Sequence, residues 1–187
     1  MTTTEMPVSF GAKAATGIEG FDTITRGGLP RGRSTLLEGG PGSGKTLFAL
    51  NFLVHGVQKL GEPGMYVAFE EAPDRIVANC TSFGWNADQI PPEQLFFFDA
   101  RVSPAMVQSG DFDLSGMLAA LGAMARQMHA KRIVFDAVDI VLALLPDEQS
   151  RRREAYRLPK CARQIAARFA TACAELSVSP ATKRRNR

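Results

Sequence analysis

The chain has 187 residues, of which 45% are hydrophobic, and a formal net charge of +3. This length and apolar content suffice for one domain with a proper core. The first residues lack the basic head and apolar run of a secretory signal, and the longest apolar run, 140–145, is far too short to span a bilayer. The cysteines, Cys80, Cys161 and Cys173, show no metal-ligand spacing. We therefore expect a cytoplasmic protein without a membrane partner.

The charge is divided unevenly along the chain. Residues 151–187 hold half of the 22 basic residues, but only Glu154 and Glu175 of the 19 acidic residues. Such a break often marks a boundary between segments. It predicts a mildly acidic body that is followed by a strongly basic tail.

Strands and helices alternate along the body. The segment from Thr16 to Gly32 is rich in turn residues and predicts irregular structure. A short apolar strand follows, and after it apolar side chains recur at steps of three and four, which predicts a helix. The same reading predicts strands at 34–38, 65–69, 95–99 and 132–136, and helices from 47 onward, from Pro73 onward and over about 114–128.

Apolar strands separated by helices are typical of a parallel sheet with both faces covered. We therefore predict an α/β fold with a mostly parallel sheet and helices on both faces. In open sheets of this kind, ligands bind beyond the carboxyl ends of the strands. Four carboxylates fall at predicted strand ends: Glu70, Glu71, Asp99 and Asp136.

The connection between the first of these strands and its helix, Gly39–Thr46, fits the phosphate-binding pattern GxxxxGK[ST] in full. Glycines let the backbone turn its N–H groups towards a polyphosphate, and the helix points its positive dipole end at the same anion. Lys45 is placed to reach the β- and γ-phosphates, and the Thr46 hydroxyl to bind Mg²⁺. The alternative, a glycine-rich turn, is disfavoured because strand and helix flank the motif as its chemistry requires.

Carboxylates at the other strand ends supply candidates for the rest of the site. Asp136 closes an apolar strand and is the expected second Mg²⁺ contact, with Asp139 as a nearby alternative. Glu70 and Glu71 are candidates for activating the attacking water. In a regular strand adjacent residues face opposite ways, so only one should point at the nucleotide, unless the turn into Ala72–Pro73 relaxes this rule. Glu70 ranks first and Glu71 second. The plain alternative is two solvated carboxylates on a loop.

Together these motifs resemble the KaiC family of RecA-like P-loop ATPases. The matching segments keep the family's order over about residues 14–158; they are Thr16–Ile18 with Asp22, Gly27–Gly32, Gly39–Thr46, Phe69–Pro73, Ser82–Trp85, Phe112–Ser115 and Lys131–Asp136. The resemblance implies a RecA-like fold that holds ATP and Mg²⁺. It also implies a homo-oligomeric, hexameric ring with ATP at the subunit interfaces, and regulatory proteins as further partners.

The resemblance implies roles for individual residues as well. Glu70 and Glu71 are catalytic in this interpretation, assisted by Lys45, and the metal contacts are Thr46 and Asp136. The residues implied to contact the nucleotide are Gly40, Pro41, Gly42, Ser43, Gly44, Lys45, Thr46, Leu47 and Ser82. Some domains of the family hydrolyse ATP slowly, and others transfer phosphate to their own Ser and Thr residues.

After Leu158 the resemblance is lost. We divide the chain into an N-terminal extension (1–13), a RecA-like core (14–158) and a basic divergent tail (159–187). In RecA-like sheets the strand after the metal-binding aspartate lies between that aspartate's strand and the phosphate-loop strand. The loss therefore predicts a gap in the centre of the sheet, which would be incomplete at its C-terminal side and would leave backbone groups unpaired.

The tail admits three interpretations. Its apolar residues recur at helical steps from near Pro159, which suggests an amphipathic helix. These residues are Cys161, Ile165, Phe169, Ala172 or Cys173, and Leu176. The terminal basic cluster 183–187 is more typical of a solvated end than of a nucleic-acid contact. The third interpretation is out-of-frame translation after about residue 158, and we hypothesise a truncated or frameshifted member of the family with a single, C-terminally truncated domain.

Three functions remain open at this point. The leading prediction is Mg²⁺-dependent ATP hydrolysis, with serine/threonine autophosphorylation as the variant known in the family. The second is a catalytically inactive nucleotide-binding fragment that acts as an interaction module. The third, a DNA recombinase on the same core, ranks last because no DNA-binding loop follows the fourth strand.

Overall fold

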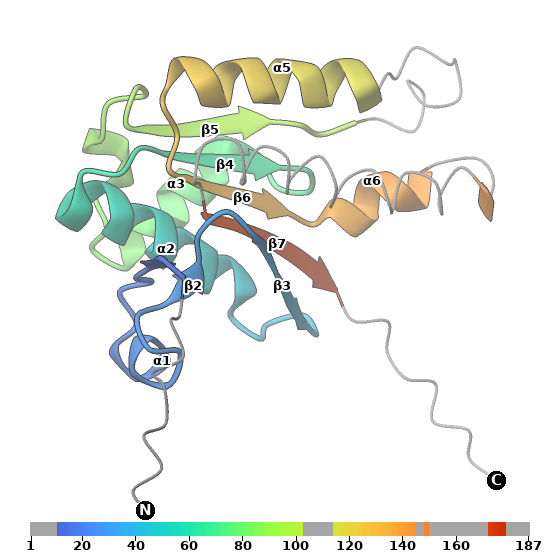
Figure 1. Ribbon diagram of the computed structural model, residues 1–187. Helices are drawn as coiled ribbons and strands as arrows, with labels where there is room; N and C mark the ends of the chain where they lie inside the picture. Colours follow the sequence, from blue (N-terminus) through green and yellow to red (C-terminus); the bar gives the residue numbers. More distant parts are fainter. Residues whose placement is uncertain (1–10, 103–113, 145–147, 150–171, 179–187) are drawn as a thin grey trace, which may run out of the picture.

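The computed structural model describes residues 11–102, 114–144, 148–149 and 172–178, and a parallel sheet forms its centre (Figure 1). The strands of this sheet are β3 (Ser34–Gly39), β4 (Gly64–Ala68), β5 (Leu95–Asp99), β6 (Arg132–Asp136) and β7 (Ala172–Val178). They lie in the order β3-β7-β6-β4-β5, and every neighbouring pair is parallel. The predicted α/β fold with a parallel sheet is therefore confirmed.

Helices cover both faces of the sheet, with α5 on one side and α2 and α3 on the other (Figure 1). The helices are α1 (Glu19–Ile24), α2 (Lys45–Leu60), α3 (Pro73–Ser82), α5 (Leu114–Gln127) and α6 (Val138–Leu144), with a 3₁₀ turn η1 (Ala87–Gln89). Among the described helices, none is both long and apolar enough to cross a membrane.

Strand β4 shows how the sequence produces this layering. All five of its residues are buried, and successive side chains point to opposite faces, as the pleat of a strand requires. Met65 and Val67 pack with α5, whereas Tyr66 and Ala68 pack with α2 and α3. An apolar run without alternation is therefore what a central strand with two covered faces needs.

The helix boundaries follow from local chemistry. Pro73 occupies the first turn of α3, where its missing N–H costs nothing. Gly61 ends α2 in the left-handed conformation, with φ of 62°. The segment that was predicted to be irregular contains α1 and the strand β2 (Leu29–Pro30), which pairs antiparallel with β1 (Lys13–Ala14) just before the segment.

The prediction for residues 172–178 is wrong. Helical spacing suggested a helix through these residues, and the sheet was expected to have a central gap. Instead, β7 fills that gap: it pairs with β3 from Ser34↔Cys173 to Gly39↔Val178 and with β6 from Arg132↔Ala172 to Phe135↔Glu175. An empty slot would leave two rows of backbone groups unpaired, and pairing with both neighbours satisfies them. The rest of the tail, 159–171 and 179–187, lies outside the described residues.

Strand β3 forms as predicted but is less buried than its apolar sequence suggested. It lies at the edge of the described sheet, beyond β7, and Leu36 is 56% exposed. An edge strand has a neighbouring strand on one side only. Its apolar side chains are therefore buried mainly where a helix packs against the face of the strand.

Candidate functional site

The phosphate-binding loop joins β3 to α2 at the carboxyl edge of the sheet. Gly42 and Gly44 have φ angles of 74° and 85°, a backbone region that favours glycine. Gly44 is the N-cap of α2 and carries no side-chain cap. The first N–H groups of a 16-residue helix therefore face the loop without a capping side chain, which suits an anion.

Lys45 is held inside this loop. Its Nζ donates to the carbonyl oxygens of Gly39 at 2.6 Å and Gly40 at 3.1 Å. The same Gly40 carbonyl accepts from the Ser43 amide at 3.3 Å, which closes a turn with Pro41 and Gly42 at its centre. The ammonium group is thus held in the loop by two backbone carbonyls.

A cavity of about 470 Å³ lies at the carboxyl edge of the sheet. It is lined by Thr46, Glu70, Glu71, Ala72, Arg75, Arg101 and Asp136. The fold therefore brings the predicted metal contacts of α2 and β6 into one hollow with the predicted catalytic carboxylates. Asp99, the remaining strand-end carboxylate, is engaged by Arg101, which donates to it from Nε at 2.9 Å and from Nη2 at 2.7 Å.

The alternation of a regular strand does not hold for Glu70 and Glu71. Strand β4 ends at Ala68, so Glu70 and Glu71 lie in bends beyond it, where the alternation of a strand no longer applies. Both residues line the cavity. Glu70 is exposed and Glu71 is partly buried.

Asp136 is the better placed of the two candidate metal aspartates, because it lines the cavity and Asp139 on α6 is not among the lining residues. The hydroxyl of Tyr66 donates to Asp136 Oδ2. Burial raises the pKa of Asp136 above its usual range; the hydrogen bond from Tyr66 opposes this rise, and Glu70 adds to it.

A second cavity, of about 680 Å³, lies beside the loop and is mainly apolar. Its walls include Leu37, Leu47, Phe48, Phe83 and Trp85, together with Gly17, Ile18, Glu38, Ser43, Gly44, Lys45 and Asn51. The rings of Phe83 and Trp85 stack with centroids 5.3 Å apart. Phe83 and Leu47 also line a smaller cavity of about 360 Å³ around the loop, which continues to Glu71.

Ser82, which was predicted to contact the nucleotide, does not line any of these three cavities. Its hydroxyl donates to the Asn79 carbonyl at 2.7 Å, within α3. The next residue, Phe83, presents its ring to two of the cavities and is 52% exposed. The predicted contact thus lies one residue from the side chain that faces the hollow.

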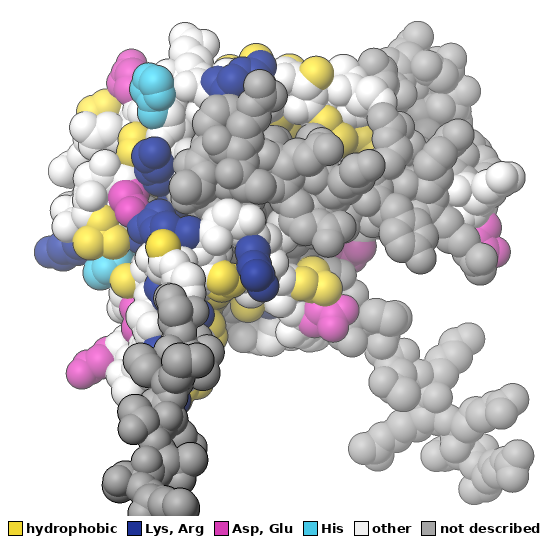
Figure 2. Space-filling model, in the orientation of Figure 1, with side chains coloured by type: hydrophobic (Ala, Val, Ile, Leu, Met, Phe, Trp, Pro, Cys, Tyr) yellow, Lys and Arg dark blue, Asp and Glu magenta, His cyan; other side chains and the backbone are white. Residues whose placement is uncertain are grey.

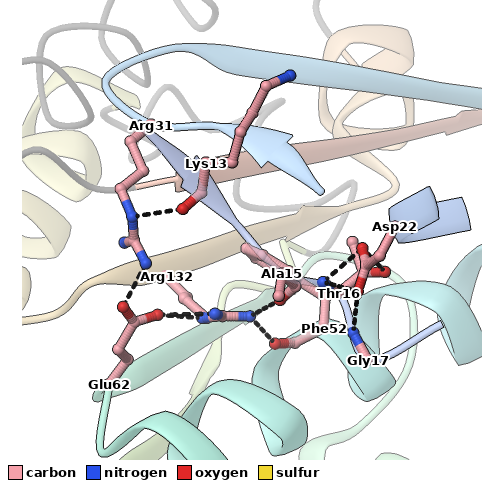
Figure 3. A network of polar contacts seen from close by, with 9 residues as sticks. All are labelled: Lys13, Ala15, Thr16, Gly17, Asp22, Arg31, Phe52, Glu62 and Arg132. Carbon is pink, nitrogen blue, oxygen red and sulfur yellow. Dashed lines mark hydrogen bonds and ion pairs between the residues drawn. The ribbon is translucent and has the colours of Figure 1, made fainter. Parts of the chain in front are cut away.

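The wall of the apolar cavity is fixed by the carboxylate of Asp22 (Figure 3). It accepts hydrogen bonds from the amides of Thr16 and Gly17, both at 2.9 Å, and from the Thr16 hydroxyl at 2.7 Å. Asn51 of α2 donates to the Thr16 carbonyl at 3.0 Å. The turn at Gly17 is therefore attached to the helix that begins at the loop.

Arg132 anchors the same segment from the start of β6. Figure 3 shows its guanidinium between Glu62, the Ala15 carbonyl and the Phe52 carbonyl, with bonds of 2.7, 2.6 and 2.7 Å. Arg31 adds an ion pair to Glu62. Arg132 is fully buried, so these partners replace the water that the charge has lost.

Basic side chains do not gather on the face shown in Figure 2. Over its described part they lie dispersed among acidic and hydrophobic side chains. A nucleic-acid surface usually carries clustered Lys and Arg residues. The low ranking of a DNA-binding function therefore stands as a prediction.

Sequence reasoning missed Tyr66, Arg75 and Arg101. The two arginines line the carboxylate cavity, and Tyr66 contacts Asp136 from within the core. The sequence offered only weak signals for these residues. Tyr66 is a single hydroxyl in an apolar strand, and the arginines follow carboxylates at predicted strand ends.

Comparison with known proteins agrees with this geometry. The family model described as "ATPase: KaiC" matches residues 14–172, and so reaches the first residue of β7. The "Circadian clock oscillator protein KaiC" of Parasynechococcus marenigrum (strain WH8102) is 43% identical over 148 residues, which cover 78% of this chain and 29% of that protein. The KaiC protein of Synechococcus elongatus (strain ATCC 33912 / PCC 7942 / FACHB-805) is 42% identical over 158 residues, 83% of this chain and 30% of the relative.

A third relative, the KaiC protein of Parathermosynechococcus lividus, is 45% identical over 148 residues, 78% of this chain and 27% of that protein. The chain thus spans less than a third of the length of these relatives. The family match also confirms the RecA-like fold class.

Proposed function

Because this chain belongs to the KaiC family of ATPases, we propose that it binds ATP together with Mg²⁺ and hydrolyses the nucleotide. The observation that carries the proposal is the cavity that Thr46, Glu70, Glu71 and Asp136 line together. It combines oxygen donors for a cation with carboxylates that can accept a proton, directly beside a loop suited to phosphate.

The donor set fits Mg²⁺. A hydroxyl and a carboxylate are hard oxygen ligands, and Mg²⁺ is usually bound by one or two carboxylates together with water and substrate phosphates. Among the described residues, no cluster of three or more His, Cys, Asp and Glu side chains is arranged to hold a metal by itself. Thr46 and Asp136 would therefore hold a cation that the nucleotide completes. Bound there, Mg²⁺ would neutralise charge on the phosphate oxygens.

The loop supplies the phosphate contacts. The N–H groups at the start of α2 and around Gly42 and Gly44 would donate to phosphate oxygens. The ammonium of Lys45 would leave the Gly39 and Gly40 carbonyls and pair with the β- and γ-phosphates.

One of the two glutamates would orient the attacking water and accept its proton. Glu70 remains our first choice and Glu71 the second, although both side chains line the cavity. The apolar cavity on the other side of the loop would take the purine base, since aromatic and aliphatic walls suit a flat heterocycle. Leu47 and Phe83 line this apolar cavity and also the smaller cavity around the loop.

Calorimetry and phosphate release test the proposal together. We expect heat on titrating ATP with Mg²⁺ into the folded chain, and at least about a tenfold loss of affinity in Lys45→Ala, which removes a charged phosphate partner. Glu70→Gln should bind ATP normally but release phosphate roughly 10²- to 10⁴-fold more slowly. Glu93→Gln, at an exposed carboxylate in a separate cavity, is the matched control.

The outcomes separate the candidate functions. If the chain binds ATP but releases no phosphate, the alternative of a non-hydrolysing nucleotide-binding module replaces ours. Release that Glu70→Gln and Glu71→Gln both leave unchanged would refute the catalytic roles. Incubation with γ-labelled ATP followed by gel analysis tests autophosphorylation on Ser or Thr.

We also propose that the chain assembles with copies of itself into a ring, and that regulatory proteins are its further partners. Membership of the KaiC family supports this proposal. Light scattering after size exclusion, with and without ATP and Mg²⁺, tests it: a mass that stays monomeric under both conditions would refute ring assembly.

A further inference from the structure

Tyr66 lies at the centre of β4, the strand between β5 and β6. Its side chain is fully buried, and its ring packs against Phe97 with centroids 5.7 Å apart. The neighbouring strand residues Met65, Val67 and Ala68 are all apolar. Burying a hydroxyl among apolar groups costs free energy unless it is hydrogen-bonded, and a phenylalanine would fill this site without that cost. The hydroxyl therefore needs an explanation.

The Tyr66 hydroxyl contacts Asp136, one of the two predicted Mg²⁺ ligands and a residue that lines the carboxylate cavity. It donates to Asp136 Oδ2. Two strands thus meet at this hydroxyl: β4 carries it, and β6 carries Asp136.

We infer that Tyr66 is a positioning residue for the metal, whose hydroxyl fixes the orientation of the Asp136 carboxylate and leaves Oδ1 for the cation or its water. This inference rests on the proposed function. A ligating carboxylate that is hydrogen-bonded by a neighbour is pre-oriented, and loss of such a neighbour typically costs about 10- to 100-fold in metal affinity. The donated proton also offsets the repulsion between Asp136 and the glutamates across the cavity.

The test is Tyr66→Phe, which keeps the ring and its packing and removes only the hydroxyl. Calorimetry on the full chain measures the affinity for ATP twice, once with Mg²⁺ and once with EDTA. We expect the variant to lose about tenfold or more of its affinity for MgATP, as for other residues that orient metal ligands, and to bind metal-free ATP like the wild type. A role in packing alone would change both affinities equally or neither.

Two further variants complete the design. Thr81→Val removes a hydroxyl that donates to the Val77 carbonyl within α3, and it should leave both affinities unchanged. Tyr66→Met fills the same strand position without a hydroxyl, so it should reproduce the selective loss if the phenylalanine variant folds poorly. A Tyr66→Phe or Tyr66→Met variant that folds and prefers MgATP as the wild type does overturns this inference alone. A wild-type chain that binds neither form of ATP overturns the proposed function, and this inference with it.

Discussion

The guanidinium of Arg132 occupies the space that a side chain on Gly56 would need. A Cβ added to Gly56 would overlap the Nε and Cδ atoms of Arg132, more closely than real Cβ atoms approach their neighbours. Gly56 belongs to α2, the helix that begins at the phosphate-binding loop, and Arg132 opens β6, the strand that ends at Asp136. The absence of one methyl group therefore lets a buried charge lie between the two elements that carry the predicted metal contacts.

Gly56→Ala should destabilise the fold. Arg132 is held by several buried partners and cannot move aside cheaply, so overpacking should cost about 3 kcal/mol in the free energy of unfolding. Urea denaturation measures this. Gly122→Ala in α5 is the matched control: its Cβ would lie 3.6 Å from Arg126, an ordinary contact, and it should be neutral or stabilise by about 0.5–1 kcal/mol. Equal effects of the two variants would contradict this account.

Glu62→Gln should also destabilise the fold strongly. It removes the charge partner of Arg132 and leaves a fully buried guanidinium without its counter-ion, which should cost about 3 kcal/mol or more. Asp99→Asn provides the comparison, because its pair with Arg101 is nearly half exposed on both sides and should cost under about 1 kcal/mol. Thermal denaturation of both variants tests this prediction. A larger loss of stability in Asp99→Asn than in Glu62→Gln would contradict it.

Asp22→Asn should weaken nucleotide binding without contacting phosphate. The carboxylate holds the turn of Thr16 and Gly17 that forms one wall of the apolar cavity, and an amide can accept fewer of its three donors. We expect affinity for ATP to fall about tenfold, equivalent to roughly 1.4 kcal/mol. Calorimetry checks this, with Asp88→Asn at an exposed position of η1 as the control. If Asp22→Asn binds ATP with unchanged affinity, this wall of the apolar cavity does not contribute to nucleotide binding.

Cys80 should be inert to alkylation at moderate pH. Burial raises the pKa of its thiol to about 11, so at pH 8 roughly one thiol in a thousand is ionised, against about a quarter for an ordinary cysteine. Labelling with iodoacetamide should therefore rise about tenfold for each pH unit between 8 and 10. Peptide-resolved mass spectrometry follows Cys80 specifically, and urea-unfolded protein supplies the control. Rapid native labelling at pH 8 would contradict the burial of this residue.

Ala174→Pro should disrupt the sheet. Ala174 lies in register with Thr35 of β3 and Val134 of β6, so proline would remove a backbone donor from a strand paired on both sides. The expected cost is about 3 kcal/mol or more. Ala174→Gly keeps the N–H group and should cost about 1 kcal/mol or less. Circular dichroism with denaturant reports the difference, and a tolerated proline would show that the pairing of β7 is dispensable.

Most of the fold and much of the candidate site could be predicted because their signals are local. The loop is a contiguous motif, and its strand and helix differ in apolar period. Asp136 could be located because an aspartate at the end of an apolar strand must lie at the same edge as the loop. For α5, the predicted span of about 114–128 agrees with Leu114–Gln127 within a residue.

The errors concern relationships that a local pattern does not contain. The apolar residues in and before β7 recur at a helical period. Pairing with the free edges of β3 and β6 nevertheless outweighs this intrinsic preference for a helix. The positions of Glu70 and Glu71 depend on where β4 ends, and strand ends are set by neighbours. The proposed role of Tyr66 depends on Asp136, which lies far from it in sequence and accepts a hydrogen bond from it in the folded chain.

The position of β7 has a consequence for biosynthesis. Within the described sheet, β3 pairs with β7 alone, so the strand that leads into the loop joins β6, β4 and β5 only through residues 172–178. During translation, the earlier strands therefore cannot complete the sheet until residues 172–178 leave the ribosome. Until then their unpaired edges are accessible to chaperones or to misassembly. We expect translation speed across these codons to influence how much active protein a cell obtains.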